Sequence, residues 1–143
     1  MAETQCVFCE ILSGELPSSL VYDGERIVAF MEINPVTPGH ALVVPRRHLP
    51  YLADLTSELA GEMMIIAQRL AAALRRSSLR TEGVNLFYAD GEAAFQEVFH
   101  AHLHVIPRFS DDGFVIGARW GTNPSRAELD RQAAEIRSVV ERD

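Results

Sequence analysis

The sequence predicts an α+β domain built on an antiparallel sheet of about five strands, with one long helix and two shorter ones. Short apolar runs alternate with turn residues, one apolar stripe recurs at helical spacing, and no repeat or low-complexity linker interrupts the chain. The 143 residues, 48% hydrophobic and 23% charged, suffice to bury a core without disulfides. We therefore expect a single domain over residues 1–143.

The first half of the chain predicts a short helix, a hairpin and a buried strand. Apolar residues recur at helical spacing over residues 7–12 and end at Gly14. Two apolar runs, 20–22 and 27–30, flank Asp23-Gly24, which is a strong hairpin signal. A rigid, proline-containing loop over 34–39 then leads into a buried strand over 40–45.

The second half begins with the long helix, which Thr56 can cap. Its apolar stripe consists of Leu59, Met63, Ile66, Ala67, Leu70 and Leu74. Strands are expected over 84–88 and 98–107, with a turn between them. The capping-box pattern of Ser125 and Glu128 begins a C-terminal helix over about 125–141.

Composition excludes several classes of function. The formal charge is −7 with a pI near 5.2, so the chain has no broad field that would attract nucleic acid or anionic lipid. All 13 basic residues are arginine, which excludes Schiff-base and P-loop lysine chemistry. No apolar stretch approaches the ~18 residues of a membrane span. The N-terminus is polar and acidic, so we expect no signal peptide and a cytoplasmic protein.

Three histidines alternate with apolar residues near the end of the chain. His100, His102 and His104 are separated by Ala101 and Leu103. On a strand, such alternation places all three imidazoles on one face, about 6 to 7 Å apart. A solvated strand face normally carries Thr, Lys, Glu or Arg, so this pattern indicates chemistry. The alternatives are a polar sheet face or an incidental metal patch.

Cys6 and Cys9 form a single C-x-x-C motif near the N-terminus. Such spacing suggests a metal site or a redox pair. A thioredoxin-like pair would follow a strand, and none precedes these residues, so the pattern favours a metal. Two thiolates cannot complete a tetrahedral zinc site, which needs two further ligands. Two buried thiols without a metal are the alternative.

The stretch from Gln96 to Arg108 resembles the signature of the histidine triad (HIT) family, in which histidines alternate with apolar residues. The likeness extends along the chain to residues 6–12, 29–35, 38–40 and 42–48, which follow the family order. The branch that the chain looks closest to is the Hint-like one, in its zinc-containing bacterial type. That resemblance implies a HIT-like fold, a purine nucleotide substrate and a homodimer.

The resemblance also implies roles for individual residues. His102 would be the nucleophile that attacks an α-phosphate, forming a nucleotidyl-histidine that water hydrolyses to a nucleoside monophosphate, and His104 would contact the phosphate. Gln96, Glu97 and Val98 would lie against the phosphate and leaving group. The base pocket would comprise Val7, Phe8, Ile11, Phe30 and Ile33, and Glu32 would bind the ribose hydroxyls.

The zinc-containing relatives imply the two missing metal ligands. They would be His48 and His100, which complete a set with Cys6 and Cys9. A closed set of four protein ligands leaves no open coordination position, so the zinc would be structural. No catalytic metal is then required.

Three positions depart from the family pattern before the triad. Ala89 stands where the family has Asn, Phe95 replaces a glycine, and Glu97 replaces a hydroxyl residue. The Glu97 carboxylate would repel polyphosphate and favour a cationic or amine leaving group.

The leading interpretation is a hydrolase that acts on purine nucleoside phosphoramidates or dinucleoside polyphosphates. One alternative is a nucleotidyltransferase or phosphorylase of the same superfamily. Another, from a different class, is a nucleotide-binding adaptor whose activity is incidental.

Overall fold

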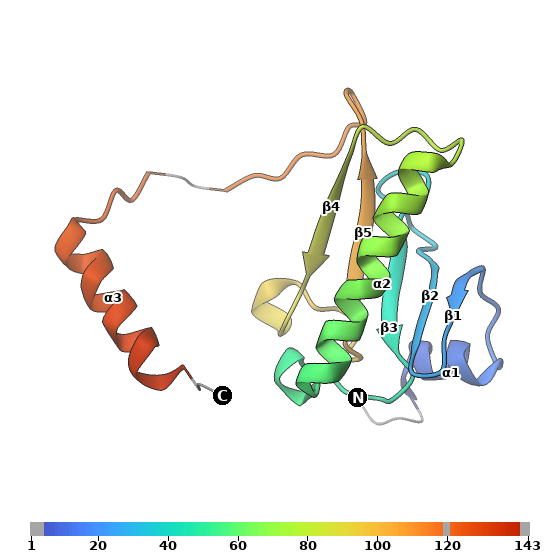
Figure 1. The fold of residues 1–143 in the computed structure, drawn as a ribbon, viewed down its shortest axis with the longest axis horizontal. Helices are drawn as coiled ribbons and strands as arrows, with labels where there is room; N and C mark the ends of the chain where they lie inside the picture. The colour runs from blue at the N-terminus through green and yellow to red at the C-terminus, as the bar shows by residue number, and fades with distance from the viewer. Residues whose placement is uncertain (1–4, 119–120, 141–143) are drawn as a thin grey trace.

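The computed structural model describes residues 5–118 and 121–140, and it has the predicted α+β architecture (Figure 1). Five antiparallel strands form one sheet in the order β1-β2-β3-β5-β4. The strands are β1 (Leu20–Asp23), β2 (Ile27–Met31), β3 (Ala41–Pro45), β4 (Gly83–Tyr88) and β5 (Leu103–Arg108). The helices are α1 (Val7–Ser13), α2 (Ser57–Arg76) and α3 (Arg126–Val139), with short 3₁₀ turns at Leu52–Asp54 and Glu92–Ala94.

The central strands are buried on both faces, which explains their continuous apolar runs. Alternate residues of β2, β3 and β5 face α2, while those between them face α1. Leu103 and Val105 belong to the α2 side, so the intervening His104 lies on the α1 side. The sheet thus separates a purely apolar layer from the layer that holds the polar chemistry.

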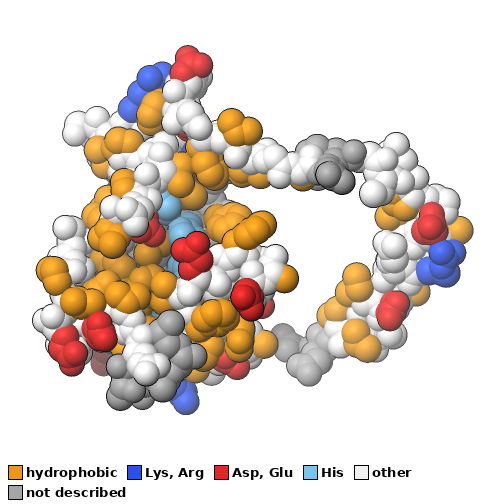
Figure 2. Space-filling view, turned by 180° about the vertical axis from the view of Figure 1, so that it is seen from behind, with side chains coloured by type: hydrophobic (Ala, Val, Ile, Leu, Met, Phe, Trp, Pro, Cys, Tyr) orange, Lys and Arg blue, Asp and Glu red, His pale blue; other side chains and the backbone are white. Residues whose placement is uncertain are grey.

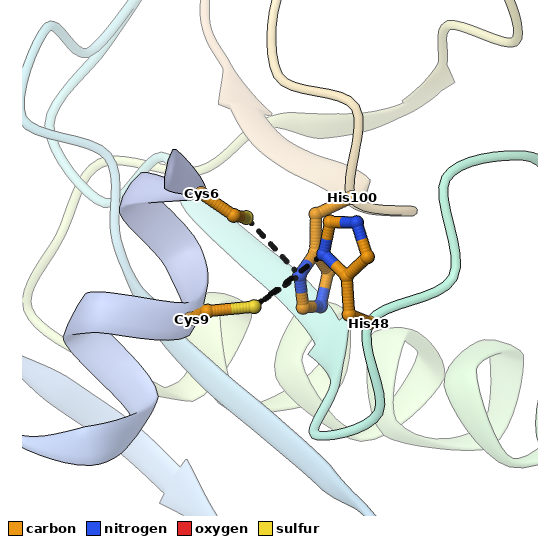
Figure 3. A group of neighbouring side chains, drawn as sticks. All are labelled: Cys6, Cys9, His48 and His100. Carbon is orange, nitrogen blue, oxygen red and sulfur yellow. Dashed lines mark hydrogen bonds between the residues drawn. The ribbon is translucent and has the colours of Figure 1, made fainter. Parts of the chain in front are cut away.

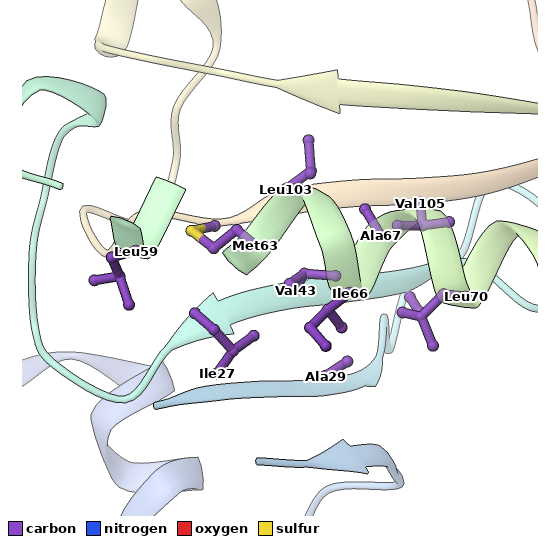
Figure 4. Close-up of a cluster of buried hydrophobic side chains, with 11 residues drawn as sticks. Ile27, Ala29, Val43, Leu59, Met63, Ile66, Ala67, Leu70, Leu103 and Val105 are labelled. Carbon is purple, nitrogen blue, oxygen red and sulfur yellow. The ribbon is translucent and has the colours of Figure 1, made fainter. Parts of the chain in front are cut away.

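The long helix α2 covers one face of the sheet, as Figure 4 shows. Its N-cap is Thr56, whose side chain accepts a hydrogen bond from the Leu59 amide at 3.1 Å. Its buried residues are Leu59, Met63, Ile66, Ala67 and Leu70, which match the predicted stripe. Burial of each large side chain contributes about 1.5–3 kcal/mol, so this layer anchors the fold.

The final strand is shorter than its sequence pattern predicts. The pattern indicates a strand from residue 98, but β5 begins at Leu103. Before it, the Ala101 amide donates to the Leu49 carbonyl at 2.7 Å instead of to a neighbouring strand. His100 and His102 therefore lie on the segment that enters the strand, and only His104 lies on the strand itself.

A glycine controls how the chain enters β3. Gly39 has φ of +99°, a conformation that favours glycine. A Cβ at this position would lie 3.0–3.2 Å from side-chain atoms of Leu74, Leu79 and Pro107. The next residue, His40, is thereby set at a fixed place ahead of the strand.

The C-terminal helix begins where the capping box predicts. The Ser125 side chain accepts from the Glu128 amide, and the Glu128 carboxylate accepts from the Ser125 amide. Every residue of α3 is exposed, and Figure 1 shows the helix apart from the sheet. Among the described residues, no helix combines the length and apolarity that crossing a bilayer requires.

Candidate functional site

A pocket of about 430 Å³ opens on the α1 side of the sheet. Figure 2 shows histidine side chains in a hollow bordered by hydrophobic and acidic side chains. The lining residues come from α1, β2 and the segments around β4 and β5: Val7, Phe8, Ile11, Pro17, Ser18, Phe30, Met31, Glu32, Ile33, Asn34, Leu42, Phe87, Phe95, Glu97, Val98, His102 and His104. This volume is in the range of small-molecule sites.

The structure brings most of the predicted substrate-binding residues to this pocket. Both predicted catalytic histidines line it, together with every predicted base-pocket residue: Val7, Phe8, Ile11, Phe30 and Ile33. Glu32, Glu97 and Val98 line it as well. Ile33 is 86% exposed, so it lies at the rim of the pocket, whereas Phe8 and Phe30 are buried in its wall.

Gln96 is the one predicted substrate-binding residue that the structure does not bring to the pocket. Its side chain is 4% exposed. The amide group donates to the carbonyls of Pro50 and Val98 and accepts from the Gly91 amide, at 2.7–3.1 Å. These three hydrogen bonds use Gln96 to hold the loop in front of the triad segment.

His102 lies in the pocket wall with one ring nitrogen committed to the backbone. Its Nδ1 is 2.7 Å from the His100 carbonyl oxygen, which can only accept, so Nδ1 carries the proton. The lone pair of the neutral ring is therefore on Nε2. Burial lowers the pKa of His102, and this outweighs the hydrogen bond to the carbonyl and the charge of Glu32. The ring is therefore neutral at physiological pH, and the lone pair on Nε2 is chemically able to attack an electrophile.

His104 is joined to a histidine outside the triad. Its Nδ1 is 2.9 Å from Nε2 of His40, and its ring centroid is 5.0 Å from that of His102. Burial, and then the positive charges that His102 and His40 would carry, lower the pKa of His104 to about 4, although Glu32 opposes them. Burial also lowers the pKa of His40. The pocket therefore contains neutral imidazoles.

The second cluster is formed by Cys6, Cys9, His48 and His100 (Figure 3). Cys6 is the N-cap of α1 and Cys9 lies in its first turn, whereas His48 follows β3 and His100 precedes β5. Their ligand atoms all lie within 4.8 Å of one another. Nδ1 of His100 is 3.5 Å from Sγ of Cys6 and 3.6 Å from Sγ of Cys9, and Nδ1 of His48 is 3.4 Å from Sγ of Cys9. Cys6 and His100 are fully buried.

The geometry of this cluster fits a tetrahedral zinc ion. Bonds of about 2.3 Å to sulfur and about 2.0 Å to nitrogen separate the two ligand atoms by about 3.5 Å at the tetrahedral angle. The observed separations match that value. Nε2 of His100 donates to the Pro45 carbonyl at 2.7 Å, which leaves the Nδ1 lone pair directed at the thiols. The predicted ligand set can therefore hold zinc.

Sequence reasoning missed some residues that complete the pocket. Phe87 forms part of the lining and is 42% exposed. Phe95, which the sequence singles out at a position where the family has a glycine, also lines the pocket and is 80% exposed. Its φ of +70° lies in the left-handed region that favours glycine. His40, which is 3% exposed, belongs to a stretch that follows the family order, but the sequence assigned it no role in the site.

The chain matches the family model described as the HIT domain over residues 13–111. A solved HIT family protein from Bacillus subtilis is 36% identical, with a TM-score of 0.87, and the match covers 97% of this chain and 99% of that one. A zinc-bound histidine triad family protein from Mycobacterium smegmatis is 38% identical, with a TM-score of 0.76, over 97% and 100% of the two chains. The Arabidopsis thaliana protein named adenylylsulfatase HINT3 is 29% identical over 98% of this chain and 70% of its own length. The agreement of sequence and fold shows that this chain belongs to the HIT family.

Proposed function

We propose that the protein is a hydrolase that cleaves purine nucleoside phosphoramidates or dinucleoside polyphosphates at the α-phosphate. The observation that best supports this proposal is the neutral His102 ring in the pocket wall. Its Nδ1 donates a hydrogen bond to the His100 carbonyl. In the proposed reaction, Nε2 attacks phosphorus and the bond to the leaving group breaks. Water then attacks the nucleotidyl-histidine and releases a nucleoside monophosphate. The name of the Arabidopsis relative supports hydrolysis at an adenylyl group.

The apolar part of the pocket suits a purine base. Phe8 and Phe30 pack edge-to-face, with ring centroids 5.4 Å apart, and provide a rigid aromatic wall. Glu32 accepts a hydrogen bond from the Asn34 amide at 3.0 Å, which orients its carboxylate at the β2 end of the pocket. A carboxylate in this position can accept from the two ribose hydroxyls.

The charge of the pocket favours a phosphoramidate over a polyphosphate. Its ionised lining residues are Glu32 and Glu97, and no Arg is among the described lining residues. A polyphosphate leaving group would therefore meet carboxylates without a compensating cation. The faces of Phe87 and Phe95 can instead attract a cationic amine. We expect a lysyl or other amine leaving group to be preferred.

We also propose that Cys6, Cys9, His48 and His100 bind a structural zinc ion, which would fix α1 to the triad segment. The matching donor distances and the zinc-bound relative support this assignment. The donor set needs reduced thiols, which is consistent with a cytoplasmic location.

A homodimer completes the proposal. The edge strand β4 exposes Leu86 and Phe87, and α2 exposes Met64 and Ile65. An exposed apolar edge strand is a surface that proteins usually cover. Light scattering coupled to size exclusion should give twice the chain mass, and a single chain mass would contradict the dimer.

The decisive experiment is rapid mixing of the protein with adenosine phosphoramidate, followed by mass spectrometry of the quenched protein. We expect an adenylate adduct on a peptide containing His102. The same experiment on His48→Ala is the control for adducts on histidines outside the pocket. Because His48 does not line the pocket, this variant should still form the adduct. If AMP binds but no adduct and no turnover are detected, the nucleotide-binding adaptor replaces the hydrolase.

A comparison of substrates tests the leaving group. Lysyl adenosine phosphoramidate should have a higher kcat/KM than diadenosine polyphosphate, and Glu97→Gln should narrow the difference. A clear preference for polyphosphates would contradict the proposed leaving-group class.

A further inference from the structure

We propose that Phe95 is a specificity-determining residue whose ring forms the outer wall of a leaving-group subsite. The ring favours phosphoramidates whose leaving amine carries a carbon chain over those that release ammonia. This inference rests on the proposed function, because it names the part of the same substrate that Phe95 contacts. The observation behind it is an exposed aromatic ring that a rigid loop holds at the mouth of the pocket.

The backbone of Phe95 has a conformation that its side chain disfavours. Its φ is +70° and its ψ is +25°, in the left-handed region where a Cβ crowds the backbone. The ring is exposed, so it gains little by burial within the fold. An aromatic side chain that strains the backbone and is barely packed indicates a contact with something other than the chain itself.

The loop before the triad segment holds this ring in one position. Gly91 and Gln96 close the neck of the loop with two hydrogen bonds. The Gly91 amide donates to the Gln96 side chain at 2.8 Å, and the Gln96 amide donates to the Gly91 carbonyl at 3.1 Å. Inside the neck, the Phe95 amide donates to the Glu92 carbonyl at 3.0 Å. A residue held in this way loses little conformational freedom when a ligand contacts it.

The aromatic side chains of the pocket come from two separate parts of the fold. Phe8, which belongs to the proposed base pocket, lies on α1, and its ring centroid is 5.0 Å from that of His102. His104 instead contacts Phe87 of β4, with centroids 5.8 Å apart. Phe95 lies on the loop that follows β4 and lines the same pocket. The histidines therefore lie between the base wall and the β4 side of the pocket.

The direction of attack brings the leaving group to the mouth of the pocket. His102 is 8% exposed and lies in the pocket wall, so its Nε2 approaches phosphorus from the wall. In phosphoryl transfer the nucleophile and the leaving group lie roughly in line on opposite sides of phosphorus. The leaving group then points away from the wall, towards the mouth, where Phe95 and Glu97 are both exposed.

The ring and the neighbouring carboxylate define the chemistry of the leaving group. Ammonia has no atom beyond the P–N bond, so it gains nothing from the Phe95 ring. An amine with an alkyl chain can lay its carbon atoms against the ring and bring a terminal ammonium to Glu97. The preferred substrates are therefore N-substituted phosphoramidates, with a lysyl group as the simplest probe.

Binding tests this subsite without turnover. In the His102→Ala protein, calorimetry compares lysyl adenosine phosphoramidate with unsubstituted adenosine phosphoramidate. The lysyl ligand should bind more tightly, and Phe95→Gly should reduce its advantage about 3- to 10-fold, because one aromatic contact is lost. Equal binding of the two ligands, or an advantage that Phe95→Gly leaves unchanged, would overturn the inference.

The glycine variant also separates recognition from folding, because glycine adopts the backbone conformation of residue 95 without strain. Its melting temperature should equal or exceed that of the parent protein. A fall of several degrees would show that the ring supports the fold, which contradicts the inference. Phe109→Leu changes a ring that does not line the pocket, so this matched control should keep the full lysyl advantage.

Turnover distinguishes the failure of this inference from the failure of the proposed function. With His102 intact, Phe95→Gly should lower the ratio of kcat/KM for the lysyl and unsubstituted substrates by the same 3- to 10-fold, roughly. If the binding preference depends on Phe95 but no adduct forms on His102, the hydrolase fails and the subsite stands. If the adduct forms and the preference does not depend on Phe95, only this inference fails. If neither ligand binds, both are refuted.

Discussion

The five histidines of the chain divide between two clusters, and both clusters contact the ring of Phe8. In one cluster, His48 and His100 direct Nδ1 at two thiols. In the other cluster, Nδ1 of each imidazole is occupied by a hydrogen bond from or to a neighbour. His100 and His102 are two residues apart and have centroids 5.8 and 5.0 Å from that of Phe8. The difference teaches that the contact of Nδ1, and not the position in the triad, determines what each histidine can do.

The same substitution in each cluster gives the sharpest test of this division. His102→Ala should reduce turnover by at least about 10⁴-fold, because no other group would form the covalent intermediate. AMP binding, measured by calorimetry, should persist. His48→Ala is the matched control, and it should lose zinc but keep measurable turnover. The comparison would fail if His102→Ala kept turnover within about tenfold of wild type.

Loss of one thiol should affect the metal and the stability before it affects the chemistry. Cys9→Ser removes a ligand that the structure places 3.4–3.6 Å from two imidazole nitrogens. We expect the zinc content, measured by plasma mass spectrometry, to fall well below one ion per chain. The melting temperature should fall by roughly 5–15 °C, because the metal stabilises only the folded chain. Full zinc content with an unchanged melting temperature would exclude this cluster as the metal site.

Phe8 tests whether the two clusters communicate through packing. Its ring is 6% exposed and packs against Phe30 as well as two histidines. Phe8→Leu should lower the free energy of unfolding by about 1–2 kcal/mol and weaken AMP binding several-fold, because the edge-to-face contacts are lost.

The matched control is Phe109→Leu, in which the lost ring packs under Arg80 and does not line the pocket. Denaturant unfolding and calorimetry should show no change of AMP affinity in that variant. Equal weakening in both variants would mean that Phe8 has no specific effect on the pocket.

The smallest expected effect concerns acid stability. His104 titrates near 4 in the folded protein and near 6.5 when unfolded. Between these pH values the unfolded chain binds more protons, so the free energy of unfolding falls as the pH is lowered from about 6.5 towards 4. His104→Asn should reduce this slope. Urea unfolding of both proteins between pH 7 and 5.5 measures it, and identical slopes would show that His104 does not contribute.

Local patterns predicted the fold well, because they depend on neighbours in the sequence. The stripe of α2, the hairpin at Asp23-Gly24 and the capping box at Ser125 all formed where the sequence indicates. The five-stranded antiparallel sheet is confirmed. The start of β5 was wrong, because the Ala101 amide bonds to the Leu49 carbonyl, which is distant in sequence.

Most of the residues predicted for the site line the pocket, apart from Gln96, whereas Phe87 lines it without having been predicted. The hydrogen bonds among these residues were not predictable. Alternation around Leu103 indicated the face on which the histidines lie, and the resemblance supplied the two ligands that complete the C-x-x-C motif. The inward-facing amide of Gln96 was not visible, because its partners are carbonyls and an amide of a loop. The hydrogen bond between His40 and His104 was not visible either. The two residues are 64 positions apart in the sequence, and only the pairing of β3 with β5 brings them together.

Gly39 has a consequence for anyone who screens this protein for inactive variants. No atom of residue 39 lines the pocket, yet a larger residue there would press on the side chains of Leu74, Leu79 and Pro107. The φ of +99° would also strain any residue with a side chain, and a backbone that relaxes from this conformation would displace the neighbouring His40. Substitutions at this glycine should therefore be recovered among the catalytic defects, and a measurement of nucleotide affinity would not reveal why.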